Sequence, residues 1–472
     1  MTAVSASAAA LAGAGDTIVA TATPPGRGAL SVIRVSGPRA HVIGRLLCAR
    51  WPGQPRQAAL TGVADCRGER LDEAVVVRYD APASFTGEDS FELSTHGGFV
   101  VPTTIVAAII EAGARLAHAG EFTRRALLNG KLDILQAEAT ADLVAAGSRA
   151  AQRVALHQLD GGLSRRIGAL RDRVLEIEAL IAYDIDFPEE DDGPVAPART
   201  LGALNALEDS LRNLLATARG GELVREGALV VLAGEPNVGK SSLFNALLGR
   251  SRAIVTPIPG TTRDALEAVI DAEPWPIRLV DTAGLRSAMD LVEQMGIEMS
   301  ESYVRRASVV LCCGEDAESI RSAAAAVRAA GEAETESRAL LLVRTKSDLD
   351  GPETDMAALL AELGARSAVT VSSETGAGIQ DLLKTIGDLL SADVGAPELD
   401  APVLTHTRHQ VGIATALEEL RQFRQAWQDA SLPATIAAVH LHSAAEALRD
   451  LIGGVDTEDI LDELFRRFCV GK

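Results

Sequence analysis

Aromatic residues are scarce in this chain, at 3% of 472 residues. A large base-stacking surface of the kind that binds single-stranded RNA is therefore not evident. Positive charge is also in short supply, because 45 Lys and Arg stand against 65 Asp and Glu and leave a net charge of −20. That balance argues against generic nucleic-acid binding through the whole surface, so any such contact needs a local basic patch or a partner.

Cysteines and long apolar runs are also few. The five cysteines are odd in number and show no zinc-site spacing, so we expect the thiols of a reducing compartment. No apolar run reaches the roughly 20 residues needed to cross a bilayer. Residues 1–15 are Ala-rich but lack the basic start and long apolar core of a secretory signal. We therefore expect a cytoplasmic protein that makes no use of a membrane.

The length and the order of patterns predict a multidomain α/β protein of about three domains. Strand-like and helix-like patterns mix over residues 1–130, with strands expected within 16–35, 73–79 and 89–94. Helical spacing dominates residues 131–225 and 391–472, which we expect to form one all-α domain.

Strand and helix patterns alternate over residues 226–390, which read as a domain inserted into the helical one. Alternation of this kind predicts a mostly parallel sheet covered by helices on both faces. The expected strands are 228–233, 268–271, 277–280, 308–312, 340–344 and 369–371.

The stretch from Gly234 to Ser242 fits G-x-x-x-x-G-K-[ST], the phosphate-binding loop. A chance glycine-rich turn is the competing explanation, but an apolar strand pattern precedes the loop and a helix pattern follows it. Lys240 would reach the β- and γ-phosphates, and the Ser241 hydroxyl would ligate Mg²⁺. The nucleotide contacts expected from this loop are Asn237, Val238, Gly239, Lys240, Ser241 and Ser242.

Two further stretches suit the metal and the γ-phosphate. Residues 259–264 supply hydroxyls, of which Thr262 would complete the Mg²⁺ shell. Asp281 ends an apolar strand and suits the same shell, while the Gly284 amide suits a γ-phosphate oxygen. The nucleotide contacts expected here are Thr256, Pro257, Ile258, Pro259, Gly260, Thr261, Thr262, Asp281, Thr282, Ala283 and Gly284.

Two more stretches suit a guanine base. Thr345-Lys346-Ser347-Asp348 ends another strand, and its Asp can accept from guanine N1–H and the 2-amino group, which adenine cannot offer. Ser372-Ser373-Glu374 is a candidate backbone clamp on guanine O6. In this order and spacing the motifs predict a Ras-like GTPase domain rather than an ATPase or kinase. Thr345 stands where Asn is usual, which puts one base-loop hydrogen bond in doubt and leaves specificity to Asp348.

The residue that should orient the attacking water is not evident from the motifs. Leu285 follows the Asp281–Gly284 stretch, where Ras-like proteins place a Gln, and Leu cannot orient water. Glu293 could reach that water through a bridging water, although spacing alone favours a solvated helix face.

End to end, the chain resembles the tRNA modification GTPase family MnmE, also called TrmE. Ordinary translational or ribosome-assembly GTPases lack both its N-terminal domain and its tail. Besides the GTPase motifs, the stretches that carry the resemblance are 22–28, 85–89, 96–98, 120–123, 131–133 and the terminus 468–472.

The resemblance implies an N-terminal folate-binding and dimerisation domain, a homodimer, and a flavoprotein partner, MnmG, that alone carries FAD, in a heterotetramer or larger complex. Together they would add an aminomethyl or carboxymethylaminomethyl group to C5 of the wobble uridine of certain tRNAs. A 5-formyl- or 5,10-methylene-tetrahydrofolate would donate the carbon. The implied folate contacts are Arg34, Glu92, Lys131 and Lys472.

The resemblance also implies that GTPase domains dimerise across a K⁺ ion that occupies the place of an arginine finger. By this resemblance, Glu293 is expected to be a catalytic residue rather than a solvated surface residue. Cys469 has three readings: a buried structural residue, a reactive thiol in tRNA modification, or a lipidation site, and the family favours the second. The implied K⁺ ligands are Asn237, Thr256, Ile258 and Thr261.

Two alternatives to a K⁺-activated modification GTPase remain open at this point. One is a GTP-dependent binding switch in ribosome assembly or translation that performs no modification chemistry. The other is a folate-dependent methyltransferase in which the GTPase domain is only regulatory.

Overall fold

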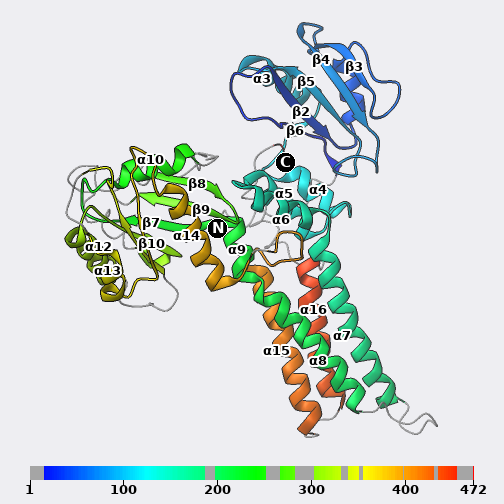
Figure 1. Cartoon of the computed structure of the whole chain (residues 1–472). Coiled ribbons are helices and arrows are strands. Elements are labelled where there is room, and N and C mark those ends of the chain that lie inside the picture. Colours follow the sequence, from blue (N-terminus) through cyan, green and yellow to red (C-terminus); the bar gives the residue numbers. More distant parts are fainter. Residues whose placement is uncertain are drawn as a thin grey trace, which may run out of the picture. The chain divides into compact units, whose positions relative to one another are not determined.

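The computed structural model divides into two compact units, Met1–Ala141 with Ile452–Lys472 and Asp142–Leu451. Figure 1 shows the course of the chain. The structure describes residues 15–186, 197–250, 266–281, 302–330, 339–349, 354–396, 398–429, 434–453 and 471.

The first unit is built on a six-stranded sheet in the order β3-β4-β5-β2-β1-β6. Neighbouring strands are antiparallel, except that β6 runs parallel to β1. The strands are β1 (Ile18–Thr21), β2 (Leu30–Ser36), β3 (Ala58–Ala64), β4 (Arg70–Tyr79), β5 (Ser90–His96) and β6 (Arg115–Leu116). The helices that accompany them are α2 (Ala40–Leu47), α3 (Val100–Glu111) and α4 (Glu121–Leu128).

Alternation along the strands builds the core of this unit. In β2, Ile33 and Val35 are fully buried and share one apolar cluster with Ile105 and Ile109 of α3. Alternate residues of β2 and residues three or four apart in α3 therefore pack against each other on this face of the sheet. The residues between them remain on the other face of the sheet, where Arg34 lies.

A partly buried ionic cluster joins α4 to Asp16, which lies just before β1. The Arg125 guanidinium donates to Asp16 Oδ1 (2.7 Å), Glu121 Oε1 (2.9 Å) and Glu88 Oε1 (3.1 Å). Arg115 also donates to Glu121 Oε1 (2.6 Å). Burial by itself would raise the pKa of Glu121, but the hydrogen bonds from Arg115, His118 N–H and Arg125 outweigh it and lower that pKa to about 2.

We expect Glu121→Gln to lower the free energy of unfolding at pH 7 by about 3 kcal/mol, because it removes one of the three carboxylates that pair with the buried Arg125 guanidinium. A carboxylate whose pKa falls from 4.5 to about 2 on folding stabilises the fold fully above pH 4.5. The difference between wild type and variant should therefore shrink as pH falls from 4.5 towards 2. Urea unfolding at pH 7, 5 and 3.5 measures it. Glu73→Gln, at a half-exposed pair with Arg70, is the control, and a pH-independent difference would contradict the assignment.

The second unit contains another six-stranded sheet, in the order β12-β11-β10-β7-β9-β8. All pairs are parallel except β8 with β9, which is antiparallel. The strands are β7 (Ala228–Ala233), β8 (Leu266–Ala272), β9 (Trp275–Asp281), β10 (Val309–Gly314), β11 (Ala339–Arg344) and β12 (Ser367–Thr370). Each strand expected between residues 228 and 371 overlaps one of these.

Helices bury both faces of this sheet. Alternate residues of β7 enter two different apolar clusters: Val230 joins Leu243 of α10 (Lys240–Arg250) and Ile379 of α14 (Ile379–Val394). Val231 joins Ile320 of α12 on the opposite face. Among the helices on that second face are α12 (Ala317–Ala329) and α13 (Met356–Leu363). A strand covered on both faces reads as a continuous apolar run, as β7 does.

Long helices from before and after this sheet pack against each other (Figure 1). Glu208 of α8, which is 1% exposed, lies 2.6 Å from the Arg424 guanidinium of α15. His440 of α16 hydrogen-bonds to Glu419 of α15 at 2.8 Å. The helices of this part are α6 (Arg149–Leu159), α7 (Gly162–Asp186), α8 (Pro197–Ala216), α9 (Ala218–Glu226), α15 (Thr407–Asp429) and α16 (Ala434–Ile452). α5 (Ile134–Ala145) begins in the first unit and ends in the second.

Within the described ranges, no helix has both the length and the apolar character that crossing a bilayer requires.

Candidate functional site

The phosphate-loop motif forms a tight turn between β7 and α10. Gly234 has φ +153°, and a Cβ there would lie 2.4 Å from the Cys313 carbonyl oxygen, so no other residue fits. Gly239 has φ +92°, which also favours glycine. α10 begins at Lys240, so the amides of the loop and of the first helical turn form a concave site suited to an anion.

Lys240 is held inside this turn. Lys240 is only 4% exposed, and its Nζ donates to the carbonyl oxygens of Gly234 (2.9 Å) and Glu235 (2.6 Å). The ammonium therefore lies over the loop rather than in solvent. From there it can donate to phosphate oxygens that enter the loop.

The structure brings Ser241 and Asp281 together. Ser241 Oγ donates to Asp281 Oδ2 at 2.7 Å, and Asp281 is fully buried at the carboxyl end of β9, beside β7. Hydroxyl and carboxylate oxygens are the hard ligands that Mg²⁺ takes, and Mg²⁺ completes its shell with water and substrate phosphates. The oxygen atoms of Ser241 and Asp281 at this point are suitable ligands for a Mg²⁺ ion.

Two side chains of the predicted base loop are tied to the phosphate loop. Thr345 is 2% exposed, and its Oγ1 donates to the Val238 carbonyl oxygen at 2.6 Å. Lys346 Nζ donates to the Asn237 carbonyl oxygen at 2.9 Å. The hydroxyl that replaces the usual Asn amide thus connects the base loop to the phosphate loop.

The two stretches predicted to bind guanine, 345–348 and 372–374, also contact each other. Ser372 Oγ donates to Asp348 Oδ1 at 2.5 Å, which orients the carboxylate. Ser347 N–H donates to the Val371 carbonyl oxygen at 3.1 Å. Ser373 and Glu374 follow in the same turn, where Glu374 is exposed. All these groups follow the carboxyl ends of parallel strands, the edge at which ligands of such sheets bind.

Some of the residues predicted to bind nucleotide, K⁺ or folate, or to act in catalysis, lie outside the described ranges. The predicted residues outside the described parts of the chain are Thr256, Pro257, Ile258, Pro259, Gly260, Thr261, Thr262, Thr282, Ala283, Gly284, Glu293, Cys469 and Lys472.

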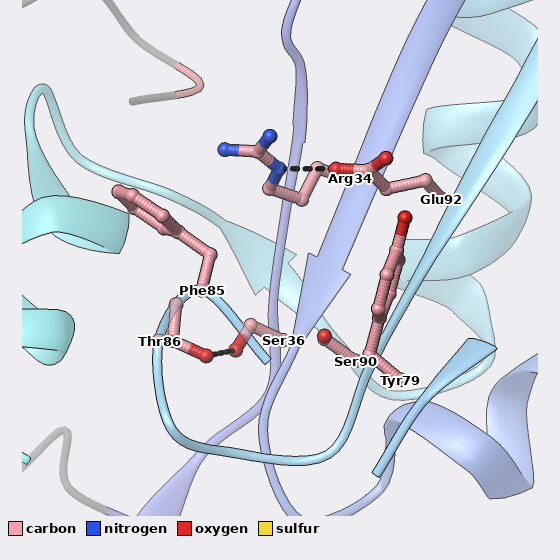
Figure 2. A pocket seen from close by; sticks show the side chains of 7 residues that line it. All are labelled: Arg34, Ser36, Tyr79, Phe85, Thr86, Ser90 and Glu92. Atoms are coloured by element: carbon pink, nitrogen blue, oxygen red, sulfur yellow. Dashed lines mark hydrogen bonds and ion pairs between the residues drawn. The ribbon is translucent and has the colours of Figure 1, made fainter. Parts of the chain in front are cut away.

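A second candidate site is a cavity of about 170 Å³ in the first unit (Figure 2). Arg34 of β2 and Glu92 of β5 pair across the strands, and Arg34 Nε donates to Glu92 Oε1 at 2.9 Å. The guanidinium carbon lies 5.3 Å from the centre of the Phe85 ring. The lining residues are Arg34, Ser36, Tyr79, Phe85, Thr86, Ser90 and Glu92.

The chemistry of this cavity suits a flat, polar ring. Burial, and next the charge of Glu92, raise the pKa of Tyr79, so its hydroxyl stays protonated and can donate. The volume is below the roughly 300 Å³ of a typical pocket for a drug-sized ligand. It fits a fragment such as one ring system.

Lys131 does not line this cavity. Its Nζ donates to the Pro82 carbonyl oxygen at 3.0 Å on an exposed part of the unit. Gly471 lies against β1, because a Cβ there would be 2.5 Å from the Thr21 carbonyl oxygen. Thr21 pairs with Ile33, the neighbour of Arg34, so the end of the chain approaches the same strands. Sequence reasoning did not predict Ser36, Tyr79 or Ser90 as lining residues, since only strand pairing places them together.

Comparisons with known proteins cover nearly the whole chain. The family model described as "GTP-binding protein TrmE N-terminus" matches residues 17–131, and "MnmE helical domain" matches residues 134–469. A protein from Azoarcus sp. (strain BH72) is 42% identical over 462 residues, covering 97% of this chain and 98% of its own. One from Aquifex aeolicus (strain VF5) is 37% identical over 458 residues, covering 97% and 100%. Both bear the name tRNA modification GTPase MnmE.

One solved structure also matches part of the chain. The G domain of the T. maritima FeoB iron transporter aligns with 34% of this chain and 98% of its own at 27% identity, with a TM-score of 0.27. A score that low carries no argument about this chain.

Proposed function

The chain belongs to the tRNA modification GTPase family MnmE (TrmE), and on that premise we propose that it uses GTP hydrolysis to drive modification of the wobble uridine in tRNA. The product would carry an aminomethyl or carboxymethylaminomethyl group at C5. The chain would act as a homodimer with the flavoprotein MnmG, which supplies FAD. One-carbon units would come from a 5-formyl- or 5,10-methylene-tetrahydrofolate.

The observation that carries the GTPase part is the meeting of three groups at one sheet edge. Lys240 lies in the phosphate loop, Asp281 lies 2.7 Å from Ser241, and Asp348 lies 2.5 Å from Ser372 at the base loop. We infer that one nucleotide would place its phosphates at Lys240, its metal at Ser241 and Asp281, and its guanine at Asp348. An ATP-specific site has no use for a carboxylate that accepts from N1–H and a 2-amino group.

Hydrolysis in this site requires water to attack the γ-phosphorus while its bond to the β–γ bridging oxygen breaks, giving GDP and phosphate. Lys240 donates to the β- and γ-phosphate oxygens, and the loop amides next to Gly239 donate to the β-phosphate. Ser241 and Asp281 would hold Mg²⁺, which would supply positive charge next to the same oxygens. Glu293 is our candidate for positioning the water through a second water, because it matches the family's catalytic Glu.

We expect K⁺ to accelerate hydrolysis about tenfold over Na⁺, because the proposed ligands would select the larger ion and hold it next to the phosphates, where it offsets the charge that develops during transfer. The proposed ligands are Asn237, Thr256, Ile258 and Thr261. Phosphate release is measured in matched KCl and NaCl buffers, with Asn237→Ala as the variant that should lose the difference. Equal rates in both salts would exclude K⁺ activation.

The Arg34–Glu92 cavity is the proposed binding place for the pterin end of the folate. Glu92 can accept from pterin N–H groups, and Arg34 and Phe85 offer a cation and an aromatic face. Lys131 and Lys472 are proposed to contact other parts of the molecule, and Cys469 is proposed to act in the modification near that terminus.

Arg34→Ala should weaken binding of 5-formyltetrahydrofolate by about ten- to a hundredfold, because it removes a charge-assisted contact worth roughly 1.5–3 kcal/mol. Isothermal titration measures the affinity. Arg70→Ala, at an exposed arginine of the same sheet, is the matched control. No folate binding by the wild type would instead favour a GTP-dependent binding switch without modification chemistry.

The overall proposal is tested by nucleoside analysis of tRNA from a cell that lacks this protein. We expect unmodified wobble uridine, restored by the wild-type chain. Fully modified tRNA in the deleted cell would overturn the proposal, whatever the nucleotide biochemistry shows.

A further inference from the structure

A histidine and two aspartates meet at the border of the first sheet, in a cluster to which no function above gives a role. His41 lies in α2, Asp80 follows β4, and Asp89 precedes β5. One potential ligand atom from each lies within 4.8 Å of the other two. Because Tyr79 pairs with Ser90 in these antiparallel strands, the two aspartates lie one step beyond a paired position. Like charges so placed are unfavourable without a cation.

Hydrogen bonds to the backbone fix the orientation of the His41 ring and of the Asp89 carboxylate. His41 Nε2 lies 3.0 Å from the Tyr79 carbonyl oxygen, which can only accept, so Nε2 carries the proton. Nδ1 lies 3.6 Å from Asp89 Oδ2, and in the neutral ring with its proton on Nε2 the lone pair of Nδ1 is available to an ion. The other oxygen of Asp89 accepts from Ala81 N–H at 2.9 Å.

This arrangement is the one that metal-bound histidines adopt. They usually donate the second ring N–H to a backbone carbonyl, which fixes the tautomer and the orientation of the ring. Ligand atoms at about 2.0–2.2 Å from a tetrahedral zinc ion lie about 3.3–3.6 Å apart. The 3.6 Å between His41 Nδ1 and Asp89 Oδ2 agrees with that separation.

Asp80 supplies an independent indication. Its Oδ1 is shielded from solvent and has no hydrogen-bond partner among the described residues. The nearest cation, Arg78 Nε, lies 3.5 Å away and makes no hydrogen bond within the same described set. Asp80 Oδ1 thus has only long ion-pair contacts, at 3.5 Å to Arg78 Nε and 3.7 Å to His41 Nε2, and a bound ion would give it a direct partner.

We propose that His41, Asp80 and Asp89 bind a divalent first-row transition-metal ion such as Zn²⁺, with water completing the shell. Imidazole and carboxylate ligands suit such ions. The ion joins α2 to both ends of the loop between β4 and β5. That loop carries Phe85 and Thr86, which line the Arg34–Glu92 cavity (Figure 2), so the ion has a structural role in shaping its wall.

Metal titration of the full-length, chelator-treated protein tests the proposal. Isothermal titration with Zn²⁺ should show one saturable site per chain, and Co²⁺ in its place should give visible absorption from a nitrogen–oxygen ligand set. His41→Ala and Asp80→Asn should each weaken Zn²⁺ binding by about 10- to 100-fold or more. Zn²⁺ should raise the melting temperature of the wild type and not that of Asp80→Asn.

The matched control is His96→Ala. His96 is an exposed histidine of the same sheet, paired with a single carboxylate, Asp72, at 2.7 Å, so its loss should leave the affinity unchanged. Asp80 is 43% exposed, so Asp80→Asn keeps the test valid should His41→Ala fail to fold. Either the absence of saturable Zn²⁺ binding or equal binding by wild type and Asp80→Asn overturns the proposal.

Discussion

Lys240→Ala should reduce GTP hydrolysis by about 10²- to 10³-fold, the usual loss when one preorganised donor to the developing charge is removed. The effect is large because the side chain is buried in the phosphate loop, where its ammonium has two loop carbonyls as partners and little water. Alanine leaves the β- and γ-phosphate oxygens without that charge. Single-turnover phosphate release at saturating GTP measures the loss.

The control for this variant is Lys384→Ala, which removes an exposed lysine of α14 in the same unit. It should hydrolyse GTP at the wild-type rate. A melting curve for Lys240→Ala separates a catalytic loss from unfolding, and expression of this variant in the deleted cell should leave wobble uridine unmodified. Wild-type turnover by Lys240→Ala would remove the phosphate loop from the proposed mechanism.

Asp348→Asn should weaken GTP binding by about 10²- to 10⁴-fold and make the protein prefer XTP. Guanine N1–H and the 2-amino group each lose a hydrogen bond to a charged acceptor, and such bonds are worth roughly 1.5–3 kcal/mol each. The amide that replaces the carboxylate presents a donor, which suits the 2-oxo group of xanthine. Because Asn keeps an oxygen that can accept from Ser372 Oγ, the loop itself should persist.

Competition between mant-GTP and unlabelled XTP or GTP measures this change of preference. Asp388→Asn, at an exposed position of α14, should leave both affinities as they are in the wild type. A loss of affinity for GTP with no gain for XTP would mean that Asp348 supports the loop rather than reads the base.

Local apolar patterning was enough to predict some strands. The run 228–233 is apolar throughout, and the observed β7 has these bounds with every residue buried. β3 was not predicted, because Ala58–Ala64 is rich in small residues and only Thr61 and Val63 are buried. Its place depends on pairing with β4, which no short stretch of sequence encodes.

The same distinction applies to the sites. Lys240 and Ser241 follow a motif of fixed spacing, so their placement near Asp281 could be anticipated from strands ending at one edge. The cavity around Arg34 draws Tyr79 and Ser90 from other strands, and their association depends on register. The doubt about Thr345 concerned a hydrogen bond that Asn usually makes, and the structure gives its hydroxyl a bond to the Val238 carbonyl oxygen.

The hydrogen bond from the Thr345 hydroxyl to the Val238 carbonyl oxygen and the one from Lys346 to the Asn237 carbonyl oxygen have a consequence for nucleotide exchange. The base loop and the phosphate loop are joined at the Asn237–Val238 backbone, so a change in how the purine is bound also changes how the phosphates are bound. A nucleotide whose base fits poorly would also be held less firmly by its phosphates and would leave sooner. Discrimination between nucleotides would then appear in residence time more than in the rate of capture.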